Sequence, residues 1–356
     1  MGGCYLITLI VFKLSAFKSF LPLMKVLIIH SGTIGETLLI TPIVRALKTE
    51  LDAEIHLLLP ESRMKVLNEN PYCERLILLN KGAIRLRKKI RNEGYDKVID
   101  LKNDLTSFII TLGNSKKRLT YGHSWFKRWI YTKTKINFLA KKHLVDRYFD
   151  LLKPLGLKGD NLGLDFYIPE KDEVENDWLP KSHRNGYAAL ALGADYATRK
   201  LPVNRLIELC DRINKPIILV GDMCDQEVAD EIESFFQQGT PAEEEAIEGL
   251  NKKAIIFNAC GKFNFNQQAS LIKNASWVFT HDNDLMHVAA AFKKQVFSIW
   301  GNTTAHFGKY PYRTQFTIFE NNKLNCRPCA FSGYANCPKG HFKCMNDVTF
   351  DFYLPD

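Results

Sequence analysis

Short apolar runs alternate with longer stretches of helical periodicity along most of the chain. An unbroken run of four to eight apolar residues is typical of a strand buried on both faces, whereas apolar residues three or four positions apart mark one face of a helix. In the first half we expect strands at Lys25–Ile29, Glu54–Leu59, Arg75–Leu79, Lys97–Leu101 and Arg118–Gly122. We expect helices at Thr37–Leu51, Arg63–Asn68, Ile84–Glu93 and Leu105–Leu112. This alternation predicts an α/β fold with a mostly parallel sheet between helices.

The alternation stops at a polar segment, Phe166–Tyr187, and then resumes. The second set of strands is expected at Ala188–Leu192, Pro216–Val220, Ala254–Phe257, Trp277–Thr280, Gln295–Trp300 and Phe316–Phe319. The helices expected between them are Val203–Ile213, Gln226–Phe236, Phe265–Lys273 and Leu285–Phe292, and Gly239–Lys253 is expected to be a solvated loop or short helix. The pattern predicts two doubly wound, Rossmann-like domains, residues 24–172 and 188–356, joined by a linker at 173–187.

Residues 1–23 are apolar but are interrupted by Lys13 and Lys18. The charges make a transmembrane helix a poor interpretation. We expect an extension that adds no domain, with a signal-like or membrane-surface segment as the alternative.

The net charge of +9 favours anionic partners such as nucleotides, phosphorylated lipid or an acidic membrane surface. No nucleic-acid-binding motif accompanies the charge, so we expect no nucleic acid partner. The 9 cysteines are odd in number and mostly scattered, which indicates reduced, cytoplasmic usage.

Ligands of doubly wound sheets bind beyond the carboxyl ends of the strands, so the strand-to-helix loops are the candidate sites. The first loop, "HSGTIGE", contains Gly32, Gly35 and Glu36. Its glycines allow close backbone approach, but the dinucleotide fingerprint and the Walker lysine are absent. Glu36 is either a reacting carboxylate or an acid that stabilises a helix start.

Three later loops carry charged side chains. Lys200, beside Arg199, would suit a pyrophosphate, and Glu227 would suit a ribose hydroxyl. In "HDNDLMH" the residues Asp282, Asn283 and Asp284 precede a helix that carries His287. The helix N-terminus favours phosphate, whereas the D-x-D spacing alone is weak support for a metal ion. For each loop the alternative is an ordinary solvated charge or helix-start acid.

The C-terminal segment "CRPCAFSGYANCPKGHFKC" holds Cys326, Cys329, Cys337 and Cys344. A C-x-x-C pair with two further thiols suggests a structural zinc or iron–sulfur site, with His341 as a competing ligand. A reduced cysteine-rich loop is the alternative.

Taken in order, several of these segments resemble glycosyltransferase family 9, the ADP-heptose:lipopolysaccharide heptosyltransferases and their relatives. The resemblance lies in "IGETLLITPIVRALK", "YDKVIDLKNDLTS", "HLVDRYFDLLKPLG", "LGADYATRKLP", "LVGDMCDQEVADEI", "ACGKFNFNQQASLIKNA", "HDNDLMHVAAAF", "FSIWGNT" and the cysteine-rich tail. It implies a GT-B fold, in which the acceptor binds the N-terminal domain and the nucleotide-sugar donor binds the C-terminal domain. It also implies an inverting reaction without a catalytic metal or other cofactor.

Carried over residue by residue, the resemblance makes Glu36 the general base, Lys200 the phosphate-facing lysine and Glu227 the ribose-facing acid. Asp282 and His287 match the ends of the family's D-T-G-x-x-H loop. Two departures bear on function: Glu36 stands in place of Asp, and Asn283-Asp284 stand in place of Thr-Gly. The longer carboxylate changes the base position, at a cost on the order of a hundredfold in rate per ångström. An acid at Asp284 would repel a diphosphate if it faced one.

We therefore expect an enzyme that transfers a sugar, heptose from ADP-heptose, onto a lipopolysaccharide core-type glycolipid. It would work in the cytoplasm, peripheral to the inner membrane. The alternatives are the same fold with another nucleotide-sugar, and a degenerate relative that binds glycan or nucleotide without turnover.

Overall fold

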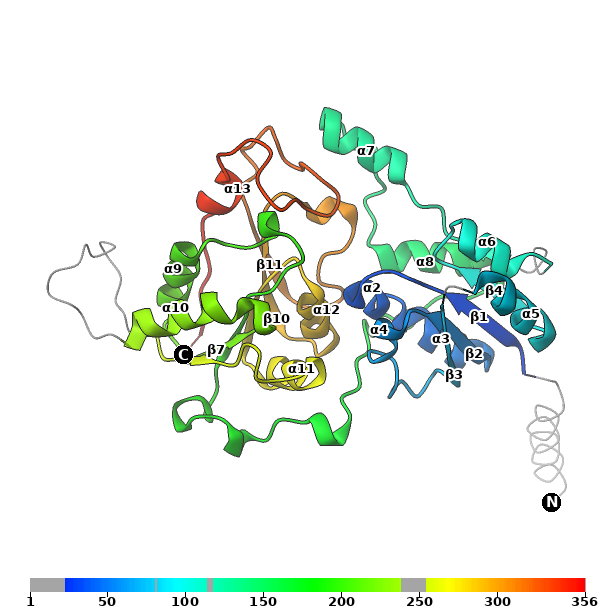
Figure 1. The fold of residues 1–356 in the computed structure, drawn as a ribbon, viewed down its shortest axis with the longest axis horizontal. Coiled ribbons are helices and arrows are strands. Elements are labelled where there is room, and N and C mark those ends of the chain that lie inside the picture. Colours follow the sequence, from blue (N-terminus) through cyan, green and yellow to red (C-terminus); the bar gives the residue numbers. More distant parts are fainter. Residues whose placement is uncertain (1–22, 81, 114–117, 238–253, 356) are drawn as a thin grey trace, which may run out of the picture.

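The chain folds around two parallel β-sheets (Figure 1). The computed structural model describes residues 23–80, 82–113, 118–237 and 254–355. The first sheet has the order β3-β2-β1-β4-β5 and the second has the order β11-β10-β9-β6-β7-β8. Every adjacent pair is parallel. In each sheet the order of the strands reverses direction beside the first strand of that half of the chain, which is β1 in one sheet and β6 in the other. This reversal defines the doubly wound arrangement.

The eleven strands of the described residues lie where the apolar runs predicted them, with ends that differ by at most two residues. They are β1 (Lys25–Ile29), β2 (Glu54–Leu59), β3 (Arg75–Leu78), β4 (Lys97–Asp100), β5 (Arg118–Thr120), β6 (Ala188–Ala191), β7 (Ile217–Val220), β8 (Ile256–Asn258), β9 (Trp277–His281), β10 (Gln295–Trp300) and β11 (Phe316–Glu320). Central strands such as β1 and β6 are almost completely buried because helices cover both faces of each sheet.

The α-helices of the first half are α2 (Ile34–Leu38), α3 (Thr41–Leu51), α4 (Glu61–Met64), α5 (Ala83–Glu93), α6 (Leu105–Thr111), α7 (Trp125–Thr134) and α8 (Leu144–Leu152). Those of the second half are α9 (Val203–Ile213), α10 (Gln226–Gln237), α11 (Phe265–Asn274), α12 (Asp284–Ala291) and α13 (Lys343–Asn346). Single 3-10 turns η3 (Glu170–Asp172), η4 (Asn176–Trp178) and η5 (Lys181–His183) lie in the polar connection between the halves.

Two of the predicted helices differ from the structure, and three helices of the described residues were not predicted. The helical stretch predicted at Thr37–Leu51, with Pro42 expected to kink it or to start its regular part, is two helices, since α2 ends at Leu38 and α3 begins at Thr41. Pro42 explains the break, because its ring excludes the carbonyl of residue 38 from a continuous helix. The helix expected at Arg63–Asn68 is the short α4, followed by turns. Helices α7, α8 and α13 were not predicted. Helix α7 buries none of its side chains, so its sequence shows no core-facing stripe.

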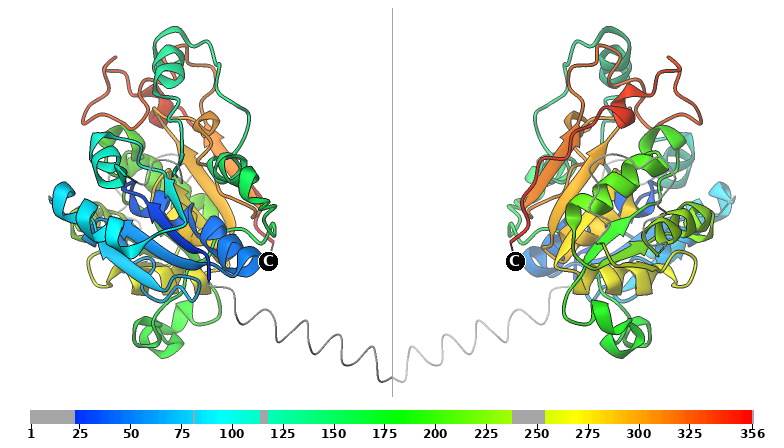
Figure 2. Two further views of the ribbon diagram at one scale, coloured as in Figure 1. Left: turned by 90° about the vertical axis from the view of Figure 1, so that its right-hand side faces the viewer. Right: turned by 90° about the vertical axis from the view of Figure 1, so that its left-hand side faces the viewer.

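The two halves share apolar contacts, and α2 of the first half packs against α12 of the second. The C-terminal segment returns alongside the second sheet (Figure 2). Phe352 of this segment contacts Phe279 and Phe297. The domain boundaries at 24–172, 173–187 and 188–356 remain a prediction. The expectations for residues 1–22 and for Gly239–Lys253 lie outside the described residues. Within the described part of the chain, no helix is both long and apolar enough to span a bilayer.

Candidate active site

A cleft of about 810 Å³ lies between the two halves. Its walls are the loops that follow β1, β6, β7 and β9, together with Arg63, Lys65 and the segment around Lys309. These loops leave the carboxyl ends of parallel strands, where doubly wound folds bind ligands. The cleft therefore brings together the four loops that carry Glu36, Lys200, Asp225 and the 282–287 segment.

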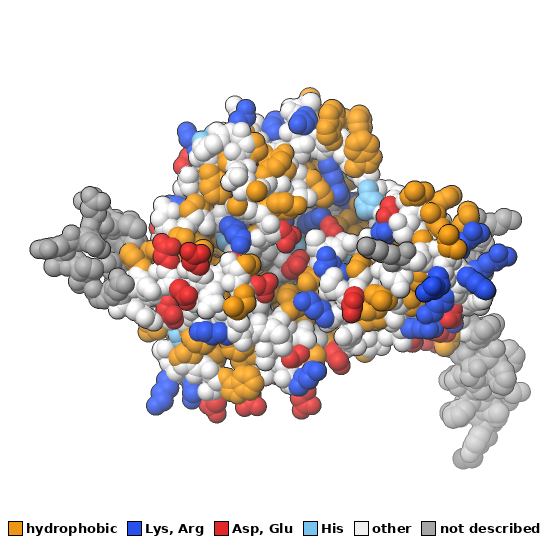
Figure 3. All heavy atoms as spheres, in the orientation of Figure 1, with side chains coloured by type: hydrophobic (Ala, Val, Ile, Leu, Met, Phe, Trp, Pro, Cys, Tyr) orange, Lys and Arg blue, Asp and Glu red, His pale blue; other side chains and the backbone are white. Residues whose placement is uncertain are grey.

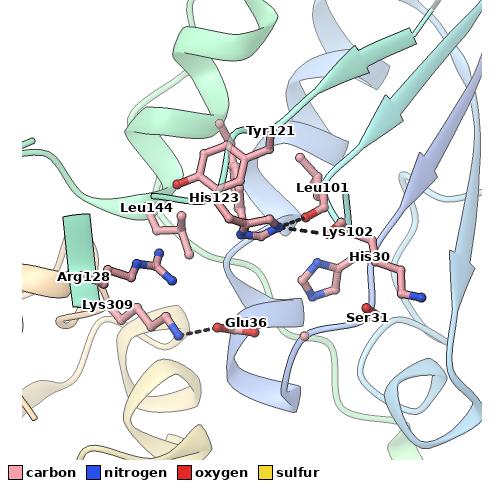
Figure 4. Close-up of a pocket in the computed structure, with 12 residues that line it drawn as sticks. His30, Ser31, Glu36, Leu101, Lys102, Tyr121, His123, Arg128, Leu144 and Lys309 are labelled. Carbon is pink, nitrogen blue, oxygen red and sulfur yellow. Dashed lines mark hydrogen bonds and ion pairs between the residues drawn. The ribbon is translucent and has the colours of Figure 1, made fainter. Parts of the chain in front are cut away.

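A second, smaller pocket of about 120 Å³ opens in the first half (Figure 4). It is lined by His30, Ser31, Gly32, Glu36, Leu101, Lys102, Tyr121, His123, Arg128, Leu144, Tyr148 and Lys309. Glu36 and Lys309 line this pocket and the interdomain cleft alike, so the two cavities adjoin at these side chains.

Glu36 is held by the first turn of α2. The Thr33 hydroxyl accepts from the backbone N–H of Glu36 at 3.1 Å, and the carboxylate Oε2 accepts from the backbone N–H of Thr33 at 3.1 Å. This reciprocal capping box fixes the helix start. The structural role foreseen for Glu36 is thus present, but it uses only one carboxylate oxygen.

The other oxygen, Oε1, forms an ion pair with the Nζ of Lys309 from the second half (Figure 4). Burial would raise the pKa of Glu36, but the charge and hydrogen bond of Lys309 outweigh it and hold that pKa at about 2. Glu36 is therefore ionised at neutral pH and ready to accept a proton, although its basicity is low while Lys309 remains in place.

Two neutral histidines flank the carboxylate. Burial lowers the pKa of His30 to about 4 and that of His287 to about 3. Among the described residues, Nε2 of His30 and Nδ1 of His287 have no hydrogen-bond partner. Buried polar atoms are seldom left unpaired in folded proteins, so these nitrogens are suited to meet a polar ligand.

At Gly32 and Gly35, any added side chain would collide with neighbouring residues. A Cβ on Gly32 would lie 2.1 Å from Oε2 of Glu36. A Cβ on Gly35 would lie 2.5 Å from Cδ2 of His287 and 2.8 Å from Oδ1 of Asp284. The absence of these side chains lets α2 approach α12 closely and leaves room for the Glu36 carboxylate.

Asp284 accepts a hydrogen bond from the backbone N–H of Gly35 at 2.7 Å. Its carboxylate is thus directed at the first half, and burial raises its pKa. Asp284 therefore links the two halves, while it also lines the cleft.

The remaining loop residues line the second half of the cleft. Lys200 Nζ lies 2.7 Å from Oδ1 of Asp225, and Arg199 lies 2.9 Å from Oδ2 of Asp282. Asp282 also accepts from the Thr303 hydroxyl at 2.8 Å.

Asn283 caps α12 by accepting from the backbone N–H of Met286 at 3.1 Å. Its side-chain amide donates to the carbonyl of Gly193 at 2.6 Å, which joins the loops after β6 and β9. The 282–287 segment is thereby held rigidly at the cleft.

Glu227 is the predicted site residue that the structure does not bring to the cleft. It is exposed on the first turn of α10, and the acids that line the cleft from this loop are Asp222 and Asp225. The Asp222 backbone N–H donates to Oδ2 of Asp225 at 3.2 Å, which closes a 3-10 turn and leaves Glu227 on the outside.

Sequence reasoning missed His30, His123, Arg128, Asp225 and Lys309. His30 and Asp225 lie within loops already singled out, and the D-x-x-D capping pattern was a readable signal for Asp225. Lys309, His123 and Arg128 lie in segments without a motif, so only their position in space reveals them.

The cysteine cluster suggested a structural zinc or iron–sulfur site, with a reduced cysteine-rich loop as the alternative. In the described part of the chain, no group of three or more His, Cys, Asp or Glu residues is arranged to hold a metal ion. Sγ of Cys326 lies 3.9 Å from Nε2 of His341, while the thiol of Cys329 donates to the Cys326 carbonyl. A structural metal at Cys326, Cys329, Cys337 and Cys344 stays a prediction.

Comparisons with known proteins agree with this architecture. Lipopolysaccharide heptosyltransferase 3 of Escherichia coli is 28% identical over 292 residues, which covers 76% of this chain and 80% of that protein. A family 9 glycosyltransferase from Veillonella parvula superposes with a TM-score of 0.63 at 20% identity, covering 84% and 87% of the two chains. The E. coli ADP-heptose lps heptosyltransferase II gives a TM-score of 0.62 at 18% identity, covering 91% and 98%. These structures confirm the GT-B fold.

Residues 83–336 match the family model described as "Glycosyltransferase family 9 (heptosyltransferase)". The match covers well over half of the chain and confirms the resemblance drawn from the sequence. The chain belongs to glycosyltransferase family 9.

Proposed function

We propose that this enzyme transfers heptose from ADP-heptose to a hydroxyl of a lipopolysaccharide core-type glycolipid, with inversion at the anomeric carbon. The observation that carries the proposal is the position of Glu36, which lines both the pocket of the first half and the interdomain cleft. An acceptor in the pocket and a donor in the cleft would meet at its carboxylate.

The proposed reaction uses this geometry in one displacement. Glu36 takes the proton of the acceptor hydroxyl, and the oxygen attacks the anomeric carbon. The new C–O bond forms on the face opposite the breaking bond to the diphosphate, whose oxygen leaves with the electron pair. A single base and a single displacement give inversion.

The leaving diphosphate needs cations or donors nearby. Arg199 and Lys200 line the donor side of the cleft, and Lys309 stands beside the reacting carboxylate. We assign charge stabilisation to these side chains, so the proposed reaction uses no metal ion or other cofactor. If Lys309 turns to the diphosphate when donor binds, Glu36 loses its ion-pair partner and becomes a stronger base.

The acceptor pocket is basic. Lys102, His123 and Arg128 line it together with Lys309. These groups suit the phosphate or carboxylate substituents of an anionic glycolipid.

The names of the E. coli heptosyltransferases support heptose as the sugar, ADP as the nucleotide and lipopolysaccharide as the acceptor class. With such an acceptor, we propose that the enzyme works in the cytoplasm, peripheral to the inner face of the membrane.

The test is incubation of the purified chain with ADP-heptose and a heptose-deficient core glycolipid. We expect ADP release that depends on the acceptor, and a product whose new linkage has the opposite anomeric configuration by NMR. Parallel assays with UDP-, GDP- and CDP-sugars examine the other donors. Retention of configuration would contradict the single-displacement mechanism, and nucleotide binding without turnover on any donor would favour a non-catalytic relative.

A further inference from the structure

Two helices of the first half expose large apolar side chains. On α6, the side chains of Leu105 and Phe108 are 74% and 50% exposed. Leu112, the residue directly after this helix, is 41% exposed. On α7, Trp125, Phe126 and Trp129 are 68%, 56% and 51% exposed. Figure 3 shows hydrophobic side chains gathered at the top of the molecule over α7 and at the right over α6. Single exposed apolar residues are common, but a concentration of this kind marks an interaction site.

The exposed face of α7 is distinct from the face that contacts the rest of the protein. Arg128 lies over the ring of Phe331 at 4.1 Å, and Tyr131 contacts Phe307. Trp125 and Trp129 are one turn apart on another side, where Phe126 stacks on Trp129. The helix buries no side chain, so these aromatic groups contribute nothing to the core.

The surroundings are strongly cationic. Helix α7 carries Lys127, Arg128 and Lys133 and no acid. Helix α5, which packs against α6, carries Arg85, Arg87, Lys88, Lys89 and Arg91 against the single acid Glu93. Tryptophan side chains favour the membrane–water interface, and Lys and Arg are attracted to anionic lipid.

The charge also argues against a second copy of the chain as the occupant. A twofold dimer through this surface would place the same patch on both sides of the interface. Cationic helices would then face one another, which is unfavourable. An anionic bilayer provides the complementary charge together with an apolar interior for the aromatic groups.

The surface adjoins the acceptor pocket. Lys102 lines the pocket three residues before Leu105, and His123 lines it two residues before Trp125. The N-terminal ends of both helices therefore stand beside the mouth of the pocket. A bilayer against them would present the head group of a membrane-embedded glycolipid to that mouth.

We propose that Leu105, Phe108, Leu112, Trp125, Phe126 and Trp129, with the cations of α5 and with Lys127 and Lys133 of α7, form a membrane-docking surface that binds an anionic bilayer. The inference rests on the proposed function for the identity of the acceptor. It adds which face of the enzyme meets the lipid and how the acceptor reaches Glu36.

The test is flotation of the full chain with vesicles of phosphatidylcholine containing about 30% phosphatidylglycerol, and with phosphatidylcholine alone. We expect binding to the anionic vesicles that weakens with salt. The combined variant Trp125→Ser, Phe126→Ser and Trp129→Ser should bind roughly tenfold less, since it loses the inserted aromatic groups. Lys127→Glu with Lys133→Glu should lose binding to the anionic vesicles as well. The matched control is Trp178→Ser with Tyr353→Ser, which removes side chains 54% and 80% exposed elsewhere.

If the aromatic variant binds anionic vesicles as strongly as the wild type does, the proposal is overturned. A second outcome would also overturn it: light scattering shows that the wild type is a dimer and the aromatic variant is a monomer, while both bind vesicles equally. Turnover on a deacylated, water-soluble acceptor separates the two proposals. We expect the aromatic variant to retain that turnover and to lose turnover on acceptor embedded in vesicles. Absence of turnover by the wild type on any acceptor would refute the proposed function and leave the vesicle result to decide the docking surface.

Discussion

The Nζ of Lys309 pairs with the carboxylate of Glu36 across the cleft between the two halves. The two residues are separated by 273 positions in the chain. The pair joins the proposed acceptor side to the proposed donor side at the proposed general base. It keeps Glu36 ionised, and it also limits how strongly that carboxylate attracts a proton.

The first prediction concerns the base itself. Glu36→Gln should lower kcat by about 10²- to 10⁴-fold, because the amide cannot accept the hydroxyl proton. The affinity for ADP, measured by calorimetry, should change little. Glu61→Gln, which neutralises an exposed acid on α4, is the control. Turnover by the Glu36→Gln variant within about twofold of wild type would remove the general-base role.

Lys309→Met should change the pH dependence of kcat/KM. The pKa of Glu36 in the folded protein is about 2, below its ordinary 4.5, so activity should lack an acid limb above about pH 4. Without Lys309, burial raises the pKa and the acid limb should move to higher pH. Lys323→Met, at an exposed position, is the control. An unchanged profile would show that Lys309 does not govern the titration of Glu36.

The same ion pair links stability to pH. Because the folded-state pKa of Glu36 is depressed, its contribution to the free energy of unfolding is present above pH 4.5 and is lost as pH falls toward 2. Lys309→Met should lose that contribution at neutral pH. Urea unfolding at pH 7 and pH 3 measures it, and we expect the difference between wild type and variant to shrink at the lower pH.

Gly35→Ala should weaken the contact between α2 and α12. The new Cβ meets the ring of His287 and the carboxylate of Asp284, so we expect a loss of about 1–3 kcal/mol in the free energy of unfolding. Gly122→Ala is the matched control, because a Cβ there has no heavy atom within 4 Å. Equal unfolding midpoints for the two variants would show that the halves tolerate the added methyl group.

Lys200→Ala should weaken ADP binding by roughly 10- to 100-fold, the range expected for loss of a charge-assisted hydrogen bond. Calorimetric titration with ADP gives the Kd directly. Lys181→Ala, an exposed lysine in the connection between the halves, should leave it unchanged. An unaltered Kd for the Lys200→Ala variant would place the diphosphate elsewhere in the cleft.

The sequence alone determined the strands, both parallel sheets and the loops that face the cleft. Apolar runs such as Lys25–Ile29 specify buried strands because their side chains have no other favourable environment. Local capping patterns, such as Thr33 with Glu36, likewise depend on residues three positions apart. The position of Glu36, Lys200 and the 282–287 segment in strand-to-helix loops was enough to select them as candidate site residues.

The tertiary structure decided what these groups face. The partner of Glu36 is Lys309, the partner of Asp284 is the Gly35 backbone, and Glu227 lies outside the cleft that Asp225 lines. Such contacts depend on how the two sheets are placed against each other, and no spacing along the chain encodes that placement. The pKa of a buried carboxylate depends on the same placement, because it is governed by the charges and the burial that distant segments provide.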